Sequence, residues 1–189
     1  MAAAQASSYS LWVMPRGPLA DKLHAEIKGL AGRTPGAHAF LPHVTLLGGI
    51  HTTQADVLQR AQQLAARLKP YRITFDKVSY GAIFHQCVYV LCATDGDIMQ
   101  AGAATREAYG QDPSSRYMPH LSLLYADISQ EERQRMAAAE QQRLLSGEQP
   151  LLAGEELGVD VTSLTVWETE ESDRSLASWR QLAEYELTG

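Results

Sequence analysis

One segment occurs twice in this sequence, and any fold of the chain must place both copies. Residues 40–50 read FLPHVTLLGGI and residues 117–127 read YMPHLSLLYAD. Both copies run aromatic, aliphatic, proline, histidine, aliphatic, hydroxyl residue, leucine, leucine. This pattern predicts a β-strand in each copy, over residues 40–48 and 117–125. Each proline then lies near a strand start, where a missing amide donor does least harm.

The histidine and the hydroxyl residue of each copy are two positions apart. Alternate side chains of a strand point to the same face, so His43 shares a face with Thr45, and His120 shares one with Ser122. Two such pairs suit chemistry at phosphorus. One neutral histidine can accept a proton from water while the other, protonated, gives one to the leaving oxygen. The hydroxyls can donate hydrogen bonds to the non-bridging phosphoryl oxygens.

The rest of the chain alternates between helical and extended patterns. Thr53 with Asp56, and Ser129 with Glu132, are predicted caps at the starts of two helices. The segment 175–187 can be read as a helix, but its apolar residues also share a period-two face, which favours a strand. Helices are predicted over residues 18–30, 52–68, 96–110 and 129–145, and further strands over residues 9–14, 71–81, 82–94, 157–170 and 175–187.

The order of these elements is nearly the same in the two halves of the chain. Residues 9–94 give strand, helix, histidine-bearing strand, helix and two strands. Residues 96–187 give helix, histidine-bearing strand, helix and two strands. We therefore predict two pseudo-symmetric lobes within one domain over residues 9–189. The two histidine-bearing strands would face each other across a cleft between the lobes, where binding sites commonly form.

Composition and charge restrict the class of protein. The chain has 189 residues, of which 45% are hydrophobic and 20% charged, as is ordinary for a soluble globular protein. The formal net charge is -6 and the pI is about 5.5. These values argue against a nonspecific grip on long nucleic acid, which draws on many basic contacts to phosphates. They leave room for a small nucleotide as the partner, and we expect a monomer.

We expect neither a secretory leader nor a membrane anchor. Residues 1–8 lack the charged start and the apolar run of a signal peptide, and we predict that they are disordered. No stretch reaches the apolar length of a membrane span. Cys87 and Cys92 would point to opposite faces of one strand, which argues against a disulfide between them and for a reducing compartment. Together these features predict a soluble, cytoplasmic protein.

Two H-x-[ST] motifs about 80 residues apart, each followed by apolar residues, resemble the two-histidine (2H) phosphoesterase superfamily. The similarity is closer to the plant-type cyclic phosphodiesterases. YSLWVMP, PHVTLL, FHQCVYVL, YMPHLSLLYA and LTVWETE all look like segments of that family, in the same order. The resemblance implies an α+β, bilobal fold in which two pseudo-symmetric lobes with antiparallel sheets line a central cleft and helices lie outside.

The resemblance assigns the two motifs to catalysis. His43 and His120 would be the catalytic pair, and Thr45 and Ser122 would bind the substrate phosphate. By the family's scheme His120 is the water-activating base and His43 the general acid, an order that the sequence itself does not determine. The implied reaction needs no metal and no cofactor. It opens ADP-ribose 1″,2″-cyclic phosphate, a by-product of tRNA splicing, to ADP-ribose 1″-phosphate, and nucleoside 2′,3′-cyclic phosphates to 2′-phosphates.

Two aromatic residues are also implied at the cleft by the resemblance. Trp12 would line it and is suited to stacking on a base or sugar, although packing in the core is a close competitor. Tyr125 would lie at the cleft as well. It is five residues after His120, so simple alternation would turn it away. Its placement therefore requires a β-bulge or a strong twist near the end of the strand.

Other interpretations remain open at this point. The plainest is that His43 and His120 are buried structural histidines, which the repetition beside a hydroxyl residue counts against. Further hypotheses are a 2H-type phosphodiesterase acting on 2′–5′ linkages or RNA ends, a non-catalytic nucleotide-binding module, and a metal hydrolase that uses both histidines as ligands. The sequence contains no recognised metal-binding motif. The remaining histidines are expected to have no catalytic role: His24, His38, His51 and His85.

Overall fold

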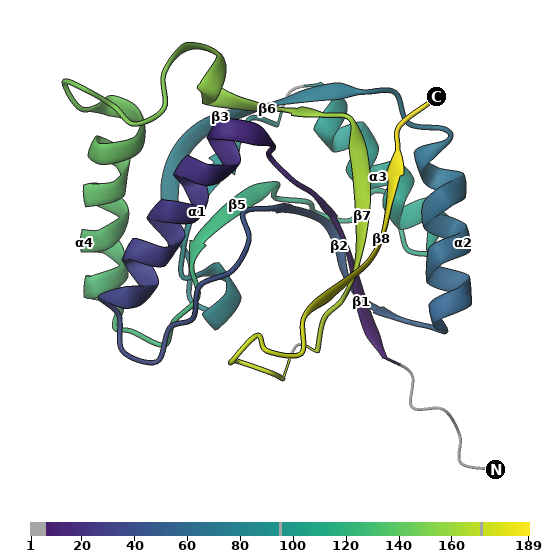
Figure 1. Ribbon diagram of the computed structural model, residues 1–189, viewed down its shortest axis with the longest axis horizontal. Helices are drawn as coiled ribbons and strands as arrows, with labels where there is room; N and C mark the ends of the chain where they lie inside the picture. The colour runs from purple at the N-terminus through teal and green to yellow at the C-terminus, as the bar shows by residue number, and fades with distance from the viewer. Residues whose placement is uncertain (1–6, 95, 171) are drawn as a thin grey trace.

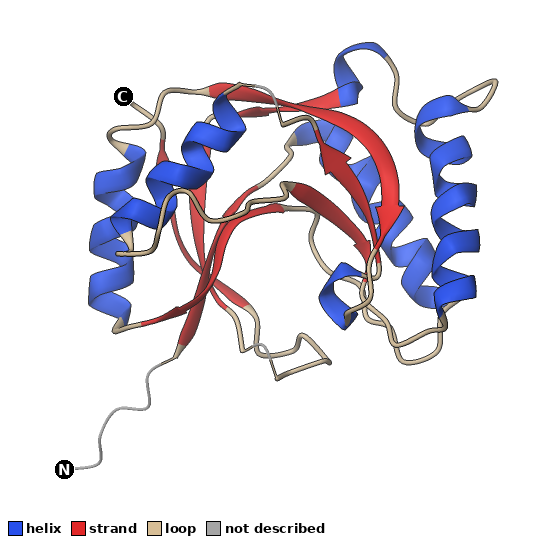
Figure 2. Cartoon of the chain, turned by 180° about the vertical axis from the view of Figure 1, so that it is seen from behind, coloured by secondary structure: helices blue, strands red, loops and turns tan. Residues whose placement is uncertain are grey.

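The protein is built around one curled, eight-stranded sheet flanked by helices on both sides (Figures 1 and 2). The structure, a computed structural model, describes residues 7–94, 96–170 and 172–189. All neighbouring strands are antiparallel, which confirms the predicted α+β class. The strands are β1 (Ser8–Val13), β2 (Val44–His51), β3 (Tyr71–Tyr80), β4 (Val88–Cys92), β5 (His120–Leu124), β6 (Gly158–Val161), β7 (Ser163–Glu168) and β8 (Arg180–Glu186). The helices are α1 (Gly17–Gly32), α2 (Gln54–Ala65), α3 (Asp97–Ala108) and α4 (Gln130–Gln141), with short helical segments η1 (Phe84–Gln86), η2 (Gln142–Ser146) and η3 (Gly154–Leu157).

The strand order, β6-β3-β4-β5-β2-β1-β7-β8, is symmetric about the middle of the sheet. β5 and β2 are the two histidine-bearing strands, and one residue pair, Val44 opposite Leu121, joins them there. α1 packs on β5 and α3 on β2 and β3, while α4 packs on β3 and β4 and α2 on β7 and β8. Each half of the sheet thus carries an equivalent pair of helices, which confirms two pseudo-symmetric lobes.

The lobes are not consecutive halves of the chain, contrary to the expectation from element order. β1 and β2 share a lobe with β7 and β8, and β3 and β4 share the other with β5 and β6. The single strand expected over residues 157–170 is in fact two, because the chain crosses between the lobes at Thr162: β6 pairs with β3 and β7 with β1. The histidine-bearing strands therefore lie side by side, and the expectation that they face each other across a cleft was wrong.

Several strands begin later than their patterns predict, including β5, which begins at His120 and not at residue 117. β2 begins at Val44, so the proline and the histidine of its motif precede the ladder. The apolar run over residues 82–94 holds η1 before β4, because the chain turns tightly at Gly81, where a Cβ would lie 2.6 Å from the backbone oxygen of Gln86. β8 is a strand, as the period-two pattern predicted, but it begins only at Arg180.

The predicted helix caps are confirmed. The side chain of Thr53 accepts a hydrogen bond from the backbone N–H of Asp56 at the start of α2. Ser129 and Glu132 form a reciprocal capping box at the start of α4. Behind its cap, α2 turns one apolar face to the sheet. The fully buried residues of this face are Val57, Ala61, Leu64 and Ala65.

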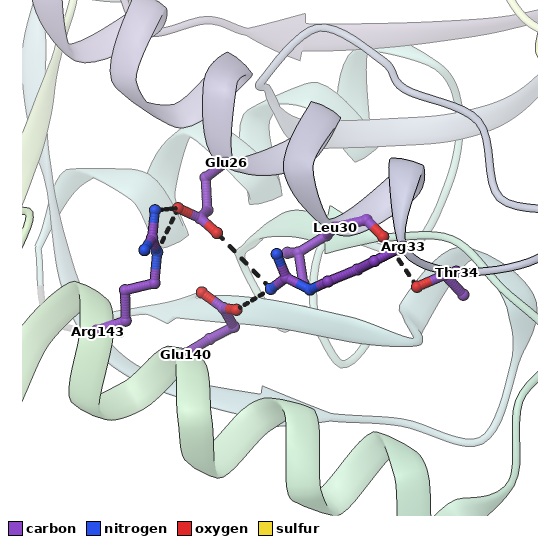
Figure 3. A network of polar contacts seen from close by, with 6 residues as sticks. All are labelled: Glu26, Leu30, Arg33, Thr34, Glu140 and Arg143. Carbon is purple, nitrogen blue, oxygen red and sulfur yellow. Dashed lines mark hydrogen bonds and ion pairs between the residues drawn. The ribbon is translucent and has the colours of Figure 1, made fainter.

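Four charged side chains join α1 to the helical segment that starts with α4 (Figure 3). Glu26 and Glu140 are both buried, with 3% and 2% of their surface exposed. Arg33 binds Glu140 at 2.8 Å and lies 4.0 Å from Glu26, and Arg143 binds Glu26 at 2.6 Å. The two arginines offset the cost of burying two carboxylates in one place.

Three further expectations concern the ends of the fold and its cysteines. The disorder predicted for residues 1–8 falls mainly on residues 1–6, which lie outside the described residues, and β1 already begins at Ser8. Cys87 and Cys92 are both free and buried. Within residues 7–94, 96–170 and 172–189, no helix is both long and apolar enough to cross a membrane.

Candidate active site

The two motifs meet where the lobes join. The residue pair between β2 and β5 fixes an antiparallel register, and one more step of that register in each direction sets His43 opposite Ser122 and Thr45 opposite His120. All four side chains therefore share one face of the sheet. The two paired residues themselves are buried on the other face. The short ladder between the lobes thus arranges two imidazoles and two hydroxyls in a compact square.

A cavity of about 320 Å³ opens over this square. All six predicted site residues line it, because Trp12 and Tyr125 join the four motif residues there. Its described lining includes no aspartate or glutamate. Across the described residues, no group of three His, Cys, Asp or Glu side chains is arranged to hold a metal ion. The ionisable groups that face a ligand in this cavity are therefore mainly imidazoles.

The two histidines are held in the same way. Nδ1 of His43 donates to the backbone oxygen of Leu41 at 2.7 Å, and Nδ1 of His120 donates to that of Met118 at 2.8 Å. A carbonyl only accepts, so Nδ1 keeps its proton and Nε2 is the nitrogen that titrates. In each case a proline separates the histidine from its acceptor, and its restricted φ helps to hold this local turn. Both rings thus have a fixed tautomer.

Burial shifts the acidity of both rings. It lowers the pKa of His43 to about 4, although the hydrogen bond to Leu41 opposes this effect and the nearby His120 adds to it. Burial also lowers the pKa of His120, against the hydrogen bond to Met118. Both imidazoles are therefore mainly neutral at neutral pH in the ligand-free protein. Each is then a competent base, and an acid only once something raises its pKa.

The hydroxyls of the square differ in how firmly they are held. The Ser122 hydroxyl donates a long hydrogen bond of 3.4 Å to the backbone oxygen of His85. In the described part of the chain, the Thr45 hydroxyl has no hydrogen-bond partner, while its backbone oxygen accepts from Tyr117. Both hydroxyls can therefore turn to donate to an anion in the cavity at little cost.

A β-bulge brings Tyr125 to the cavity. Leu124 pairs with Val88, whereas Ser122 pairs with Tyr89, so β5 holds one residue more than β4 between these two pairs. Both leucines of the motif are consequently buried in the core. The residue after them returns to the cavity face. The bulge that the position of Tyr125 requires is therefore present.

Tyr125 lies against one of the two histidines. Its phenol oxygen is 3.4 Å from Nε2 of His43, and its ring stacks on Phe40 at 3.9 Å between centroids. Burial raises the pKa of Tyr125 far above its usual range, so the phenol stays protonated. This hydroxyl can donate to a neutral His43 or accept from a protonated one.

The first motif carries the same bulge with a different outcome. Leu47 pairs with Leu11, whereas Thr45 pairs with Trp12, so an extra residue again buries both leucines. The residue that then returns to the cavity is Gly48. The glycine places no side chain beside the second histidine. The cavity is thus asymmetric, with a tyrosine at His43 and a glycine at the equivalent position.

Trp12 does not offer a ring face to a ligand. Its indole stacks on His43 at 3.6 Å between centroids on one side and on Trp167 at 4.5 Å on the other. Only its edge lines the cavity, with 3% of the residue exposed. The stacking on a base or sugar that the family resemblance implied is therefore not available to Trp12. Its contact is with His43 instead.

Two aromatic residues that were not predicted as site residues also line the cavity. His85, for which no catalytic role was expected, lies in η1, and Trp179 lies in the loop before β8. Their rings are 6.0 Å apart and nearly parallel, at 21°. Ile83, 57% exposed, lies at the same rim. No spacing in the sequence links these three residues, because they come from two loops of opposite lobes.

Known proteins are similar to this chain over nearly its whole length. A family model for cyclic phosphodiesterase-like proteins matches residues 7–187. A cyclic phosphodiesterase of Arabidopsis thaliana is 30% identical over 175 residues, which cover 93% of this chain and 92% of the relative. A 2′,3′-cyclic-nucleotide 3′-phosphodiesterase of Eremothecium gossypii is 32% identical over 143 residues, covering 63% of this chain and 66% of the relative.

Solved structures share the fold at lower identity. The apo form of E. coli LigT superposes with a TM-score of 0.62 at 15% identity, covering 98% of this chain and 100% of LigT. The protein TT0787 of Thermus thermophilus superposes with a TM-score of 0.63 at 16% identity, covering 96% of this chain and 98% of that chain. The curled sheet and paired lobes are therefore an arrangement that experiment has found in other chains.

Proposed function

The chain belongs to the cyclic phosphodiesterase-like family of the 2H phosphoesterase superfamily, and from this premise we propose which bond it breaks and how. The proposed substrates are nucleoside 2′,3′-cyclic phosphates, opened to 2′-phosphates, and ADP-ribose 1″,2″-cyclic phosphate, opened to ADP-ribose 1″-phosphate. One observation carries the proposal. Two histidines with Nδ1 tied to the backbone share one cavity with two hydroxyls.

The proposed step is an attack of water on the cyclic phosphodiester. A neutral imidazole removes a proton from the water as its oxygen bonds to phosphorus. The bond from phosphorus to the ribose 3′-oxygen breaks, and the second imidazole, protonated, gives its proton to that oxygen. Each proton transfer contributes roughly 10²–10⁴ in rate. Thr45 and Ser122 donate to the non-bridging oxygens, where negative charge is held through the reaction.

The asymmetry of the cavity supports His120 as the base and His43 as the acid. Gly48 carries no side chain where the other motif has Tyr125, which leaves more room for a water molecule on the His120 side. Tyr125 lies within 3.4 Å of Nε2 of His43 and can accept from the protonated ring. Burial works against a proton on His43, since it lowers the pKa of that ring. The negative charge of the bound phosphodiester raises this pKa, so substrate binding itself charges the acid.

The rim of the cavity suits the base of a nucleotide. Trp179 and His85 present nearly parallel rings, and Ile83 adds an exposed apolar side chain beside them. Aromatic and aliphatic faces bind a planar base of any identity through stacking. We therefore assign to these residues the contact with the base, and expect weak discrimination among the four bases.

The experiment that tests the proposal is hydrolysis with a chelator present. The substrates are the four nucleoside 2′,3′-cyclic phosphates, ADP-ribose 1″,2″-cyclic phosphate and a 2′–5′-linked dinucleotide. We expect chelator-resistant turnover of the cyclic phosphates, with 2′-phosphates as the nucleoside products. Loss of activity with chelator would favour metal-dependent hydrolysis. Turnover of the dinucleotide alone would favour the 2′–5′ phosphodiesterase, and binding without turnover would favour the nucleotide-binding module.

A further inference from the structure

A second cavity, of about 500 Å³, opens directly beside the first. The two cavities have four lining residues in common: Thr45, Gly48, Gln86 and His120. Away from this shared edge, the second cavity is lined by Arg106, Arg116 and Tyr117, and we call it the arginine groove. Its described lining includes two arginines and no acidic residue, in a chain whose formal net charge is -6.

Arg106 is the main charge of the arginine groove. Only 7% of this residue is exposed. Its Nη1 donates to the backbone oxygen of Gly102 at 2.7 Å, and its guanidinium carbon lies 4.5 Å from the ring centre of Tyr117. Among the described residues no carboxylate forms an ion pair with it. A buried guanidinium without a counter-ion is costly to keep, and its planar donors match phosphate oxygens.

The packing around Arg106 holds it at the groove. Tyr117 lies flat against α3, where a Cβ on Gly102 would come within 2.6 Å of its ring. The phenol of Tyr117 donates to the backbone oxygen of Thr45 at 2.9 Å. Tyr117 thus connects the phosphate-binding motif to the helix that carries Arg106. The fold positions this arginine relative to the catalytic square through one rigid aromatic side chain.

Arg116 supplies a second, exposed positive charge. It is exposed, lies in the loop before β5, and makes no ion pair with a described residue. A buried, fixed arginine and an exposed, free one together suit an anion that enters from solvent and is then held.

We propose that the arginine groove binds a second phosphate group of the substrate, carried on C5 of the ribose whose cyclic phosphate is opened. The inference rests on the proposed function and adds to it the residues that would bind the phosphate on C5. The enzyme then prefers ribose cyclic phosphates with a 5-phosphate, a 5-diphosphate or a 5-phosphodiester over nucleoside cyclic phosphates with a free 5-hydroxyl. His120 lies at the edge that the two cavities share. A substrate bound there would place its cyclic phosphate in the first cavity and its C5 phosphate in the arginine groove.

The test compares adenosine 2′,3′-cyclic phosphate with its 5′-phosphorylated form, each measured as kcat/KM. We expect the wild type to favour the 5′-phosphorylated form by roughly tenfold or more, the gain of one or two charged hydrogen bonds. Arg116→Ala and Arg106→Met are expected to reduce this ratio to near one. Arg135→Ala, on the exposed face of α4 away from both cavities, is the matched control and keeps the wild-type ratio. Thermal unfolding checks that Arg106→Met remains folded.

A second measurement needs no turnover. Calorimetry compares adenosine 2′-phosphate with adenosine 2′,5′-bisphosphate, and the same two variants are expected to lose the tighter binding of the bisphosphate. If both adenosine substrates are hydrolysed with equal kcat/KM, or the arginine variants keep the preference, the groove is not a phosphate subsite and the proposed function stands. If neither substrate is hydrolysed, the proposed function fails, and calorimetry alone decides on the groove.

Discussion

The indole of Trp12 lies face to face with the imidazole of His43, with 3.6 Å between the ring centroids and 13° between the planes. An indole face attracts a cation, so the stack favours the protonated imidazole. Burial acts in the opposite direction and lowers the pKa of His43. The acidity of this histidine is therefore a balance between the exclusion of water and the aromatic ring beneath it.

Replacing Trp12 with leucine is expected to lower the pKa of His43 further. Loss of a cation–π contact worth roughly 0.5–2 kcal/mol corresponds to a decrease of roughly 0.4–1.5 pH units. Trp12→Phe keeps a smaller ring and is expected to give a smaller decrease. The measurement is an NMR titration of the His43 ring with adenosine 2′-phosphate bound. A higher pKa in Trp12→Leu would show that the indole acts mainly by excluding water.

Tyr125→Phe is expected to slow the reaction without loosening the fold. The phenol oxygen next to His43 is lost, while the stack on Phe40 is kept. We expect kcat to fall roughly 2- to 12-fold, the range of one hydrogen bond of 0.5–1.5 kcal/mol. Tyr109→Phe is the control, since its phenol donates to the backbone of Val57 outside the cavity. It should lower the melting temperature and leave kcat unchanged; the reverse pattern would contradict the assignment.

The pH dependence of the two kinetic constants is expected to differ. In the free enzyme the pKa values of His43 and His120 are both lowered by burial, that of His43 to about 4. The active form holds one imidazolium and one neutral ring, so kcat/KM should peak below pH 6.5, the ordinary pKa of histidine. The bound phosphodiester raises both pKa values, and the optimum of kcat should lie at higher pH. Coinciding optima would show that substrate binding does not charge the acid.

Glu140 is expected to make the fold less stable as the pH rises. Burial and the nearby Glu26 raise its pKa from 4.5 to about 7, although Arg33 and Arg143 oppose this. A carboxyl with a raised pKa binds its proton more tightly in the folded chain. The stability that it contributes is therefore full at low pH and is lost between about pH 4.5 and pH 7.

Urea unfolding at pH 5 and at pH 8 tests this linkage. The wild type should lose roughly 1–3 kcal/mol between the two pH values through this group, at about 1.4 kcal/mol for each pKa unit. Glu140→Gln should remove that difference. Glu131→Gln, on the exposed side of the same helix, should retain it. An equal pH dependence in Glu140→Gln and the wild type would place the titrating group elsewhere.

The repeated segment was enough to select the four residues of the square, because a strand's alternation fixes which side chains share a face. That rule paired His43 with Thr45 and His120 with Ser122, and the pairing of β2 with β5 brings the two pairs together. The position of Tyr125 also requires a β-bulge. The only local indication of a bulge is the second leucine of each motif, an apolar residue at a position that alternation would turn to the cavity. The equivalent leucine in the first motif marks a second bulge, which places Gly48 at the cavity. That placement becomes visible only from the pairing of the strands.

Other features of the site depend on contacts between residues far apart in the sequence, and could not be predicted from it. The stack that covers both faces of Trp12 depends on Trp167, which lies far along the sequence on the neighbouring strand β7. The exchange of strands between lobes depends on a crossing at Thr162 that looks, in sequence, like the middle of one strand. His85 and Trp179 meet only because loops of opposite lobes converge. These features follow from the topology of the sheet, and the spacing of residues along the chain does not predict them.

Two-histidine acid–base catalysis is tested most directly by kcat for a nucleoside 2′,3′-cyclic phosphate in His43→Ala, His120→Ala and the double variant. Each single variant should lose roughly 10²–10⁴ in kcat, and the double variant little more than the worse single one, because both groups act in one step. His38→Ala, in an exposed loop, should match the wild type. If either single variant keeps near-wild-type kcat, the paired mechanism is contradicted.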